Sequence, residues 1–179
     1  MTGDPDRTEQ LAKIAVFRGL TPDEFRQLLG ISREVTFESG QTIIEQGQTS
    51  QALWVLLEGA CQVVRKTAHA GTAVLAELSP DDLFGEMSFF SPAPHSASVV
   101  ATTRVTLLRL DRADYDALIH DDAAVAYKLA YNVVERVAKR LRTMDHRLAA
   151  LADDCDEEPA ENRPEWHRFR ENLFGHWNL

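Results

Sequence analysis

Residues 84–100 read FGEMSFFSPAPHSASVV, and the expected fold is built around this stretch. It predicts the end of a strand, a glycine turn, one turn of helix, a proline-bounded loop and a new strand. Gly85 permits a tight turn and lets a ligand approach the main chain. A helix that begins at Glu86 leaves its first N–H groups unpaired, and these donors, with the helix dipole, favour an anion. Pro92 and Pro94 end that helix.

Short apolar runs separated by polar turns surround this stretch. Glycines at positions 40, 47 and 59 lie in three of the turns. Runs of this length at such regular intervals predict a small sandwich or barrel. With the strand end at residue 84, the expected strands cover residues 34–37, 42–45, 52–57, 61–66, 72–78, 96–101 and 103–110.

Helical patterns flank the strands on both sides. The sequence TPDE at residues 21–24 is a capping box with proline at the first helical position, and Gly30 ends that helix. Asp111 is the expected N-cap of a helix that comes after the strands. The apolar positions expected to face inward are Leu11, Ile14, Ala15 and Phe17, then Phe25, Leu28 and Leu29, then Tyr115, Leu118 and Ile119.

A long helix is expected from Asp122 to about Ala152. Apolar or small residues recur mostly every three or four positions, at 126, 130, 133, 137, 141, 144, 148 and 151, which is typical of a coiled-coil seam. The seam favours a homodimer; the alternative is a helix folded along its own domain. Its excess of basic residues indicates a solvated or partner-facing side rather than a nucleic-acid surface.

The whole composition narrows the class of protein. The 179 residues are 44% apolar and carry a formal charge of −9, which argues against free-standing nucleic-acid binding. No apolar run approaches the length of a membrane span, and the first residues do not resemble a signal peptide. Cys61 and Cys155 are far apart and indicate no disulfide framework. We expect a cytoplasmic protein.

The quoted stretch resembles the phosphate-binding cassette of cyclic nucleotide-binding domains, the family of bacterial catabolite activator proteins and protein kinase A regulatory subunits. The family cassette reads approximately F-G-E-[LIM]-[AGS]-L, a short loop, then R-[ST]-A-x-V. The sequence FRGLT at residues 17–21 also matches a family pattern, so the resemblance spans about residues 15–120. The cassette residues that we take as the candidate ligand site are Phe84, Gly85, Glu86, Met87, Ser88, His95, Ser96 and Ala97.

The resemblance implies a role for several of these residues. Glu86 would hold the ribose 2′-hydroxyl, and the backbone at Gly85–Met87, with Ser96, would surround the cyclic phosphate. His95 departs from the family, which has an arginine in ion pair with the phosphate at this position. Histidine lacks the permanently charged, planar fork of arginine, so binding through it would be weaker and pH-dependent.

The resemblance also implies the overall fold. We expect an α+β protein: an eight-stranded antiparallel, jelly-roll-like β-roll with N-terminal helices, a long C-terminal helix and a short terminal helix. The expected divisions are a flexible arm (1–9), the roll with its flanking helices (10–121), the long helix (122–155), and an acidic linker with an amphipathic terminal helix (156–179).

The last division indicates that a signal would be read by another protein and not by a helix-turn-helix in this chain. The acidic run DDCDEE at residues 153–158 is typical of a linker, and the residues after it are too few for the helix-turn-helix of the family's bacterial regulators. The terminal helix carries an apolar stripe that must be buried on the roll, a second protomer or another protein. Its residues are Trp166, Phe169, Leu173, Phe174 and Trp177.

Patterns of catalytic or metal chemistry are not found in the sequence: there is no HExxH, zinc-spaced cysteine pair, nucleophile elbow or phosphate loop of an NTPase. His95 as an axial haem ligand is a rival interpretation. We therefore expect a regulatory module and not an enzyme. It would sense cyclic AMP or cyclic GMP weakly and signal to a partner protein, without a DNA-binding domain. The alternative is a ligand-independent dimeric scaffold with a degenerate pocket.

Overall fold

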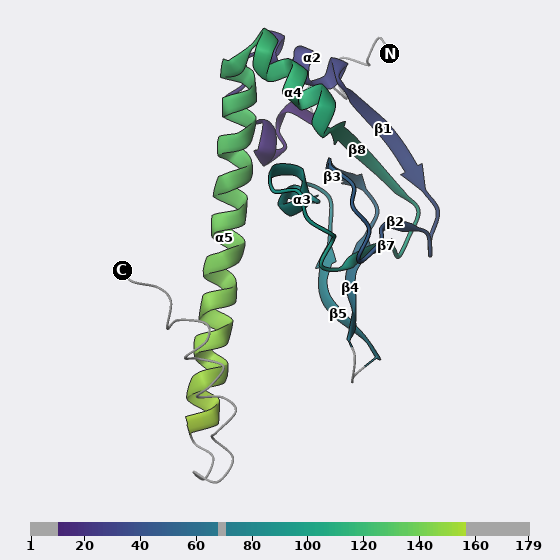
Figure 1. Ribbon diagram of the computed structural model, residues 1–179, viewed down its shortest axis with the longest axis vertical. Helices are drawn as coiled ribbons and strands as arrows, with labels where there is room; N and C mark the ends of the chain where they lie inside the picture. Colours follow the sequence, from purple (N-terminus) through teal and green to yellow (C-terminus); the bar gives the residue numbers. More distant parts are fainter. Residues whose placement is uncertain (1–10, 68–70, 157–179) are drawn as a thin grey trace. The chain divides into compact units, whose positions relative to one another are not determined.

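The computed structural model describes residues 11–67 and 71–156, with residues 150–156 as backbone only (Figure 1). The expected terminal arm at residues 1–9, and the terminal helix with its apolar stripe, lie outside the described residues. The chain separates into two compact units, Met1–Val134 and Glu135–Leu179, within the last helix of the described residues.

Eight antiparallel strands form two four-stranded sheets, which confirms the expected α+β fold and its β-roll (Figure 1). The strand order is β1-β8-β3-β6 in one sheet and β2-β7-β4-β5 in the other. The strands are β1 (Ser32–Phe37), β2 (Thr42–Ile44), β3 (Ala52–Glu58), β4 (Cys61–Thr67), β5 (Gly71–Leu78), β6 (Leu83–Phe84), β7 (Ser98–Ala101) and β8 (Val105–Asp111).

The helices in the described residues are η1 (Ala15–Phe17, a 3-10 turn), α2 (Pro22–Gly30), α3 (Glu86–Phe90), α4 (Arg112–Asp121) and α5 (Ala123–Asp156). The capping box of α2 is confirmed: Glu24 N–H donates to Thr21 Oγ1 at 3.3 Å, and Thr21 N–H donates to Glu24 Oε2 at 2.7 Å. The carboxylate of Asp122 accepts from two N–H groups in the first turn of α5. No described helix is long and apolar enough to cross a membrane.

Three expected details of the helices are wrong. Ala15 is exposed and Val16 is buried, because the chain forms a 3-10 turn there instead of an α-helical face. Ile119 is exposed near the end of α4. Asp111 occupies the N-cap position of α4, but its side chain does not cap the helix. The carboxylate pairs with Arg33 and Arg109 from β1 and β8 instead.

The first turns of α5 pack on the roll. Val125, Leu129 and Val133 are almost fully buried in the same cluster as apolar residues of β3, β8 and the N-terminal segment. Lys128 Nζ donates to both carboxylate oxygens of Glu24 at 2.7 and 2.8 Å. The expected dimer seam is therefore wrong at its start, because positions 126 and 133 face the chain's own core.

Asn132 ties α5 to the N-terminal segment. Its side-chain amide is buried and donates to the carbonyl oxygens of Val16 and Arg18 at 2.9 and 2.8 Å. We expect Asn132→Ala to lower the free energy of unfolding by about 1–3 kcal/mol, since two carbonyl groups lose a shared donor. Urea denaturation measures this change. Lys139→Ala, at an exposed position of α5, is the control, and a loss no larger than the control's would contradict the role.

Candidate functional site

The candidate site is the cassette, residues 84–97, and its first feature is the turn at Gly85. Gly85 precedes α3 with a φ of +82°, which side-chain-bearing residues rarely adopt. A Cβ atom there would lie 2.5 Å from the carbonyl oxygen of Ala52 and 3.1 Å from Cδ1 of Trp54. The turn is thus pressed against β3. Only glycine fits this position without displacing the main chain of the sheet.

The strand before the turn is anchored by an aromatic stack. Phe84 is buried in β6, and its ring stacks on Trp54 with 6.2 Å between centroids and 5° between planes. The guanidinium of Arg109 also lies over the Trp54 ring, 5.2 Å from its centroid. This packing fixes the direction in which the chain enters the glycine turn.

The short helix α3 is held by one inward face. Phe89 is fully buried and Ser88 is 4% exposed, whereas Met87 is 69% exposed. Glu86 is half-buried at the first position of the helix. Since the inward residues belong to the core, α3 is a fixed part of the roll and presents Met87 to solvent.

Arg112 of α4 fastens the end of α3. Its Nη1 donates to the carbonyl oxygen of Phe89 at 2.9 Å, and its guanidinium lies over the rings of Phe89 and Tyr115. Its Nε also pairs with Asp116 at 2.8 Å. This residue was not predicted from the sequence, because an arginine early in a helix does not indicate which distant carbonyl it reaches.

His95 lies at the end of the cassette loop, and the residue is 9% exposed. Nδ1 is 3.0 Å from Ser88 Oγ, and Nε2 is 2.7 Å from Ser50 Oγ. Burial lowers the pKa of the imidazole from its ordinary value of 6.5. Both ring nitrogens are occupied by serine hydroxyls, so the ring as it stands offers no hydrogen bond to an outside anion or to haem iron. Ser50 was not predicted from the sequence either.

The remaining cassette residues come after His95 and lead into the next strand. Ser96 is exposed and Ala97 is half-buried, just before β7 begins at Ser98. The structure therefore joins His95 to the α3 end of the cassette by a side-chain contact, and places Ser96 at the surface. In the described part of the chain, no group of three or more His, Cys, Asp or Glu side chains is arranged to hold a metal ion.

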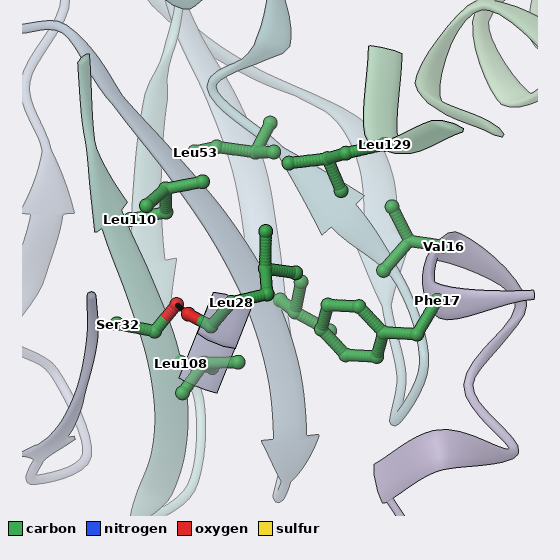
Figure 2. Close-up of a pocket in the computed structure, with 9 residues that line it drawn as sticks. Val16, Phe17, Leu28, Ser32, Leu53, Leu108, Leu110 and Leu129 are labelled. Carbon is green, nitrogen blue, oxygen red and sulfur yellow. Dashed lines mark hydrogen bonds between the residues drawn. The ribbon is translucent and has the colours of Figure 1, made fainter. Parts of the chain in front are cut away.

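A small cavity lies elsewhere, in the core between the N-terminal segment, β3, β8 and α5 (Figure 2). Its volume is about 10 Å³, and its lining is apolar except for Ser32, whose hydroxyl donates to the carbonyl oxygen of Leu28 at 2.8 Å. A nucleotide needs a site of a few hundred Å³, so this void is a packing defect and not a ligand pocket.

Comparison with known proteins points to the same family that the cassette resembles. Residues 34–122 match the model of the cyclic nucleotide-binding domain. The cyclic AMP receptor protein of Thermus thermophilus is 36% identical over 137 residues, covering 76% of this chain and 62% of that protein. A CRP-like cAMP-activated global transcriptional regulator of Mycobacterium tuberculosis is 28% identical over 143 residues, covering 80% of this chain and 62% of that protein.

A solved structure agrees with these sequence matches. The crystal structure of the Thermus thermophilus catabolite activator protein has a TM-score of 0.68 and 35% identity, covering 77% of this chain and 63% of that one. The chain spans 62% of the length of each of the two curated relatives described above. The family model covers the chain from within β1 to the end of α4.

Proposed function

Because this chain belongs to the cyclic nucleotide-binding domain family, we propose that its cassette binds cyclic AMP or cyclic GMP and that the module is regulatory rather than catalytic. The observation that carries the proposal is the glycine turn. Gly85 is held at a positive φ against β3, and α3 is fixed behind it by Phe89 and Arg112. A rigid turn of this kind can present main-chain N–H groups to a phosphate without being ordered first.

Four cassette residues contact the ligand in the proposal. The main chain at Gly85, Glu86 and Met87, with the hydroxyl of Ser96, surrounds the cyclic phosphate. The carboxylate of Glu86 accepts from the ribose 2′-hydroxyl. The positions of the two residues support this assignment, because Ser96 is exposed and Glu86 is half-buried at the start of α3.

Binding would be read out by a partner protein. A ligand can shift the equilibrium between two conformations only by its difference in affinity for them. We propose that the contacts of the ligand with the cassette supply this difference in affinity, and that the change is passed to a protein that contacts the module.

Thermal melting tests the proposal in its simplest form. A ligand at about 100 times its Kd stabilises the native state by about 2.7 kcal/mol, so cyclic AMP or cyclic GMP should raise the Tm by several degrees. 5′-AMP is the control, since it keeps the base and ribose but lacks the cyclic phosphodiester. No shift at millimolar cyclic nucleotide, or an equal shift with 5′-AMP, would contradict the proposal.

We also propose that a second copy of the chain covers an apolar stripe on α5. Large apolar side chains stay exposed at intervals of three or four along this helix, and the first three of them lie on a different face from the α5 residues buried in the core. They are Tyr127, Tyr131, Val134, Val137, Leu141 and Met144. The spacing supports a helix-to-helix seam, shifted by about one position from the one expected at the start of α5.

Leu141→Glu should weaken such a dimer by at least about 10-fold, because each copy would then place a carboxylate in the apolar seam. Sedimentation equilibrium measures the dimer Kd. Lys139→Glu is the control, since it puts the same charge at an exposed position of the same helix. A wild-type chain that stays monomeric at about 100 µM would exclude a stable dimer through this stripe.

A ligand-independent scaffold is the second candidate function. The observation that favours it is His95, whose ring nitrogens both engage serine hydroxyls within the protein. Under this alternative the dimer forms as before, and cyclic nucleotides neither bind nor change the assembly.

A further inference from the structure

The described part of the chain has three buried polar residues: Ser88, His95 and Asn132. Ser88 and His95 belong to the cassette and contact each other. His95 reaches Ser88 through Nδ1 and Ser50 through Nε2. Ser50 belongs to the connection between β2 and β3, residues 45–51, which is far from the cassette in sequence. The imidazole thus bridges two segments that are far apart in the sequence.

The tautomer of His95 decides which atoms of this bridge donate. A Ser88 hydroxyl that donates to the carbonyl oxygen of Gly85, at 3.3 Å, leaves Oγ to accept from Nδ1–H of His95. Nε2 is then the acceptor for the hydroxyl of Ser50. This order leaves a neutral ring with its proton on Nδ1. One chain of hydrogen bonds therefore runs from Ser50 through His95 and Ser88 to the turn at Gly85.

The main chain fixes the same residue a second time. His95 N–H donates to the carbonyl oxygen of Gln48, and Gly47 N–H donates to the carbonyl oxygen of His95, both at 2.9 Å. The side-chain amide of Gln51 also donates to the carbonyl oxygen of Ser88 at 3.2 Å. The β2–β3 connection therefore holds both ends of the cassette loop, the end of the loop through His95 and its beginning through Ser88.

We infer that His95 is a positioning residue: its neutral ring clamps the cassette to the β2–β3 connection through Ser50 and Ser88, and does not contact the phosphate of a ligand. The effect of the clamp on affinity rests on the proposed function, whereas the clamp itself exists in the ligand-free protein. The clamp keeps the glycine turn and the loop in one conformation before a ligand arrives, so less conformational entropy is lost on binding.

The clamp fixes the direction of the pH dependence. The segments packed against the ring carry two titratable side chains, Glu45 and Glu86, and the carboxylate of Glu45 accepts from the side-chain amide of Gln48 at 2.7 Å. The pKa of the ring is lowered by its burial. Between the lowered value and 6.5 the unfolded chain binds more protons than the native protein, so the free energy of unfolding rises with pH. The stabilisation is complete above 6.5 and is lost as pH falls through the folded pKa.

Ligand affinity should change with pH in the same direction. If His95 paired with the phosphate, protonation would strengthen binding, and the affinity for cyclic AMP would rise toward acid pH. Under the clamp, the affinity is equal or lower at about pH 6 than at about pH 8. The two roles of His95 thus predict opposite trends from one titration series.

Nitrogen-15 NMR of the imidazole tests the clamp in the full chain without a ligand. We expect the tautomer with the proton on Nδ1, and a ring pKa below the ordinary value that does not rise when cyclic AMP is added. Ser50→Ala removes the hydroxyl at Nε2, so it should mix the tautomers and weaken cyclic AMP binding by about 5- to 10-fold. Ser91→Ala, an exposed serine of the same loop, is the control and should leave the ring signals unchanged.

The outcomes separate this inference from the proposed function. A proton on Nε2, a ring pKa at its ordinary value, or a ring pKa that rises with cyclic AMP would overturn the clamp, even if the nucleotide binds. The expected tautomer and lowered ring pKa, with the change in Ser50→Ala, would support the clamp even if no nucleotide binds. In that case only the proposed function would fail.

Discussion

Gly85→Ala is expected to lower the free energy of unfolding by about 2–5 kcal/mol and to abolish cyclic nucleotide binding. Two costs add at this position. An alanine at a φ of +82° is strained, and its Cβ would lie 2.5 Å from the carbonyl oxygen of Ala52. Since that oxygen belongs to β3, it can move only if the sheet moves, and the turn that presents the cassette would shift with it.

Gly40→Ala is the matched control for this experiment. Gly40 has a φ of +86°, but a Cβ there would meet no atom within 4 Å. It should therefore show only the conformational cost, about 1–2 kcal/mol, and should leave ligand affinity unchanged. Urea denaturation of both variants gives the two values. Equal losses would mean that the close approach of the turn to β3 contributes nothing.

Glu86→Ala is expected to remove one direct contact between the cassette and the ligand. A hydrogen bond to a charged group contributes about 1.5–3 kcal/mol, so loss of the ribose contact should weaken cyclic AMP binding about 10- to 150-fold. Calorimetric titration of the variant measures the change. Glu77→Ala, an exposed glutamate on β5, is the control for the change of net charge.

The same variant separates the sensor from the scaffold. Under the proposed function, Glu86→Ala needs about 10- to 150-fold more ligand for any ligand-dependent change, while the dimer Kd stays at its wild-type value because the apolar stripe on α5 is intact. If wild type and variant bind cyclic AMP equally well, Glu86 is not the ribose partner. If neither binds, the scaffold is the better description.

The sequence predicted the features that local chemistry determines. Gly85, Pro92 and Pro94 mark the turn and the ends of α3 without help from the rest of the chain. The strands fall within a few residues of their expected bounds, since alternating apolar runs and turn glycines are short-range signals. The capping box of α2 was equally visible, because all its atoms lie within four consecutive residues.

The features that were missed depend on contacts between distant segments. The direction of the His95 ring is set partly by Ser50, which is 45 residues away in the sequence. The face of α5 that packs on the roll is set by Val16, Phe17 and their neighbours, so a seam drawn from spacing alone merged that face with the exposed stripe. No periodicity in one helix can separate two apolar faces that have different partners.

Calorimetric titration of the full chain with cyclic AMP and cyclic GMP, at about pH 6 and about pH 8, is the decisive measurement for the cassette. We expect binding in the micromolar range to the wild-type protein, with an affinity at the lower pH that does not exceed the affinity at the higher pH. No heat of binding with millimolar ligand at either pH would contradict the proposal that this cassette binds a cyclic nucleotide.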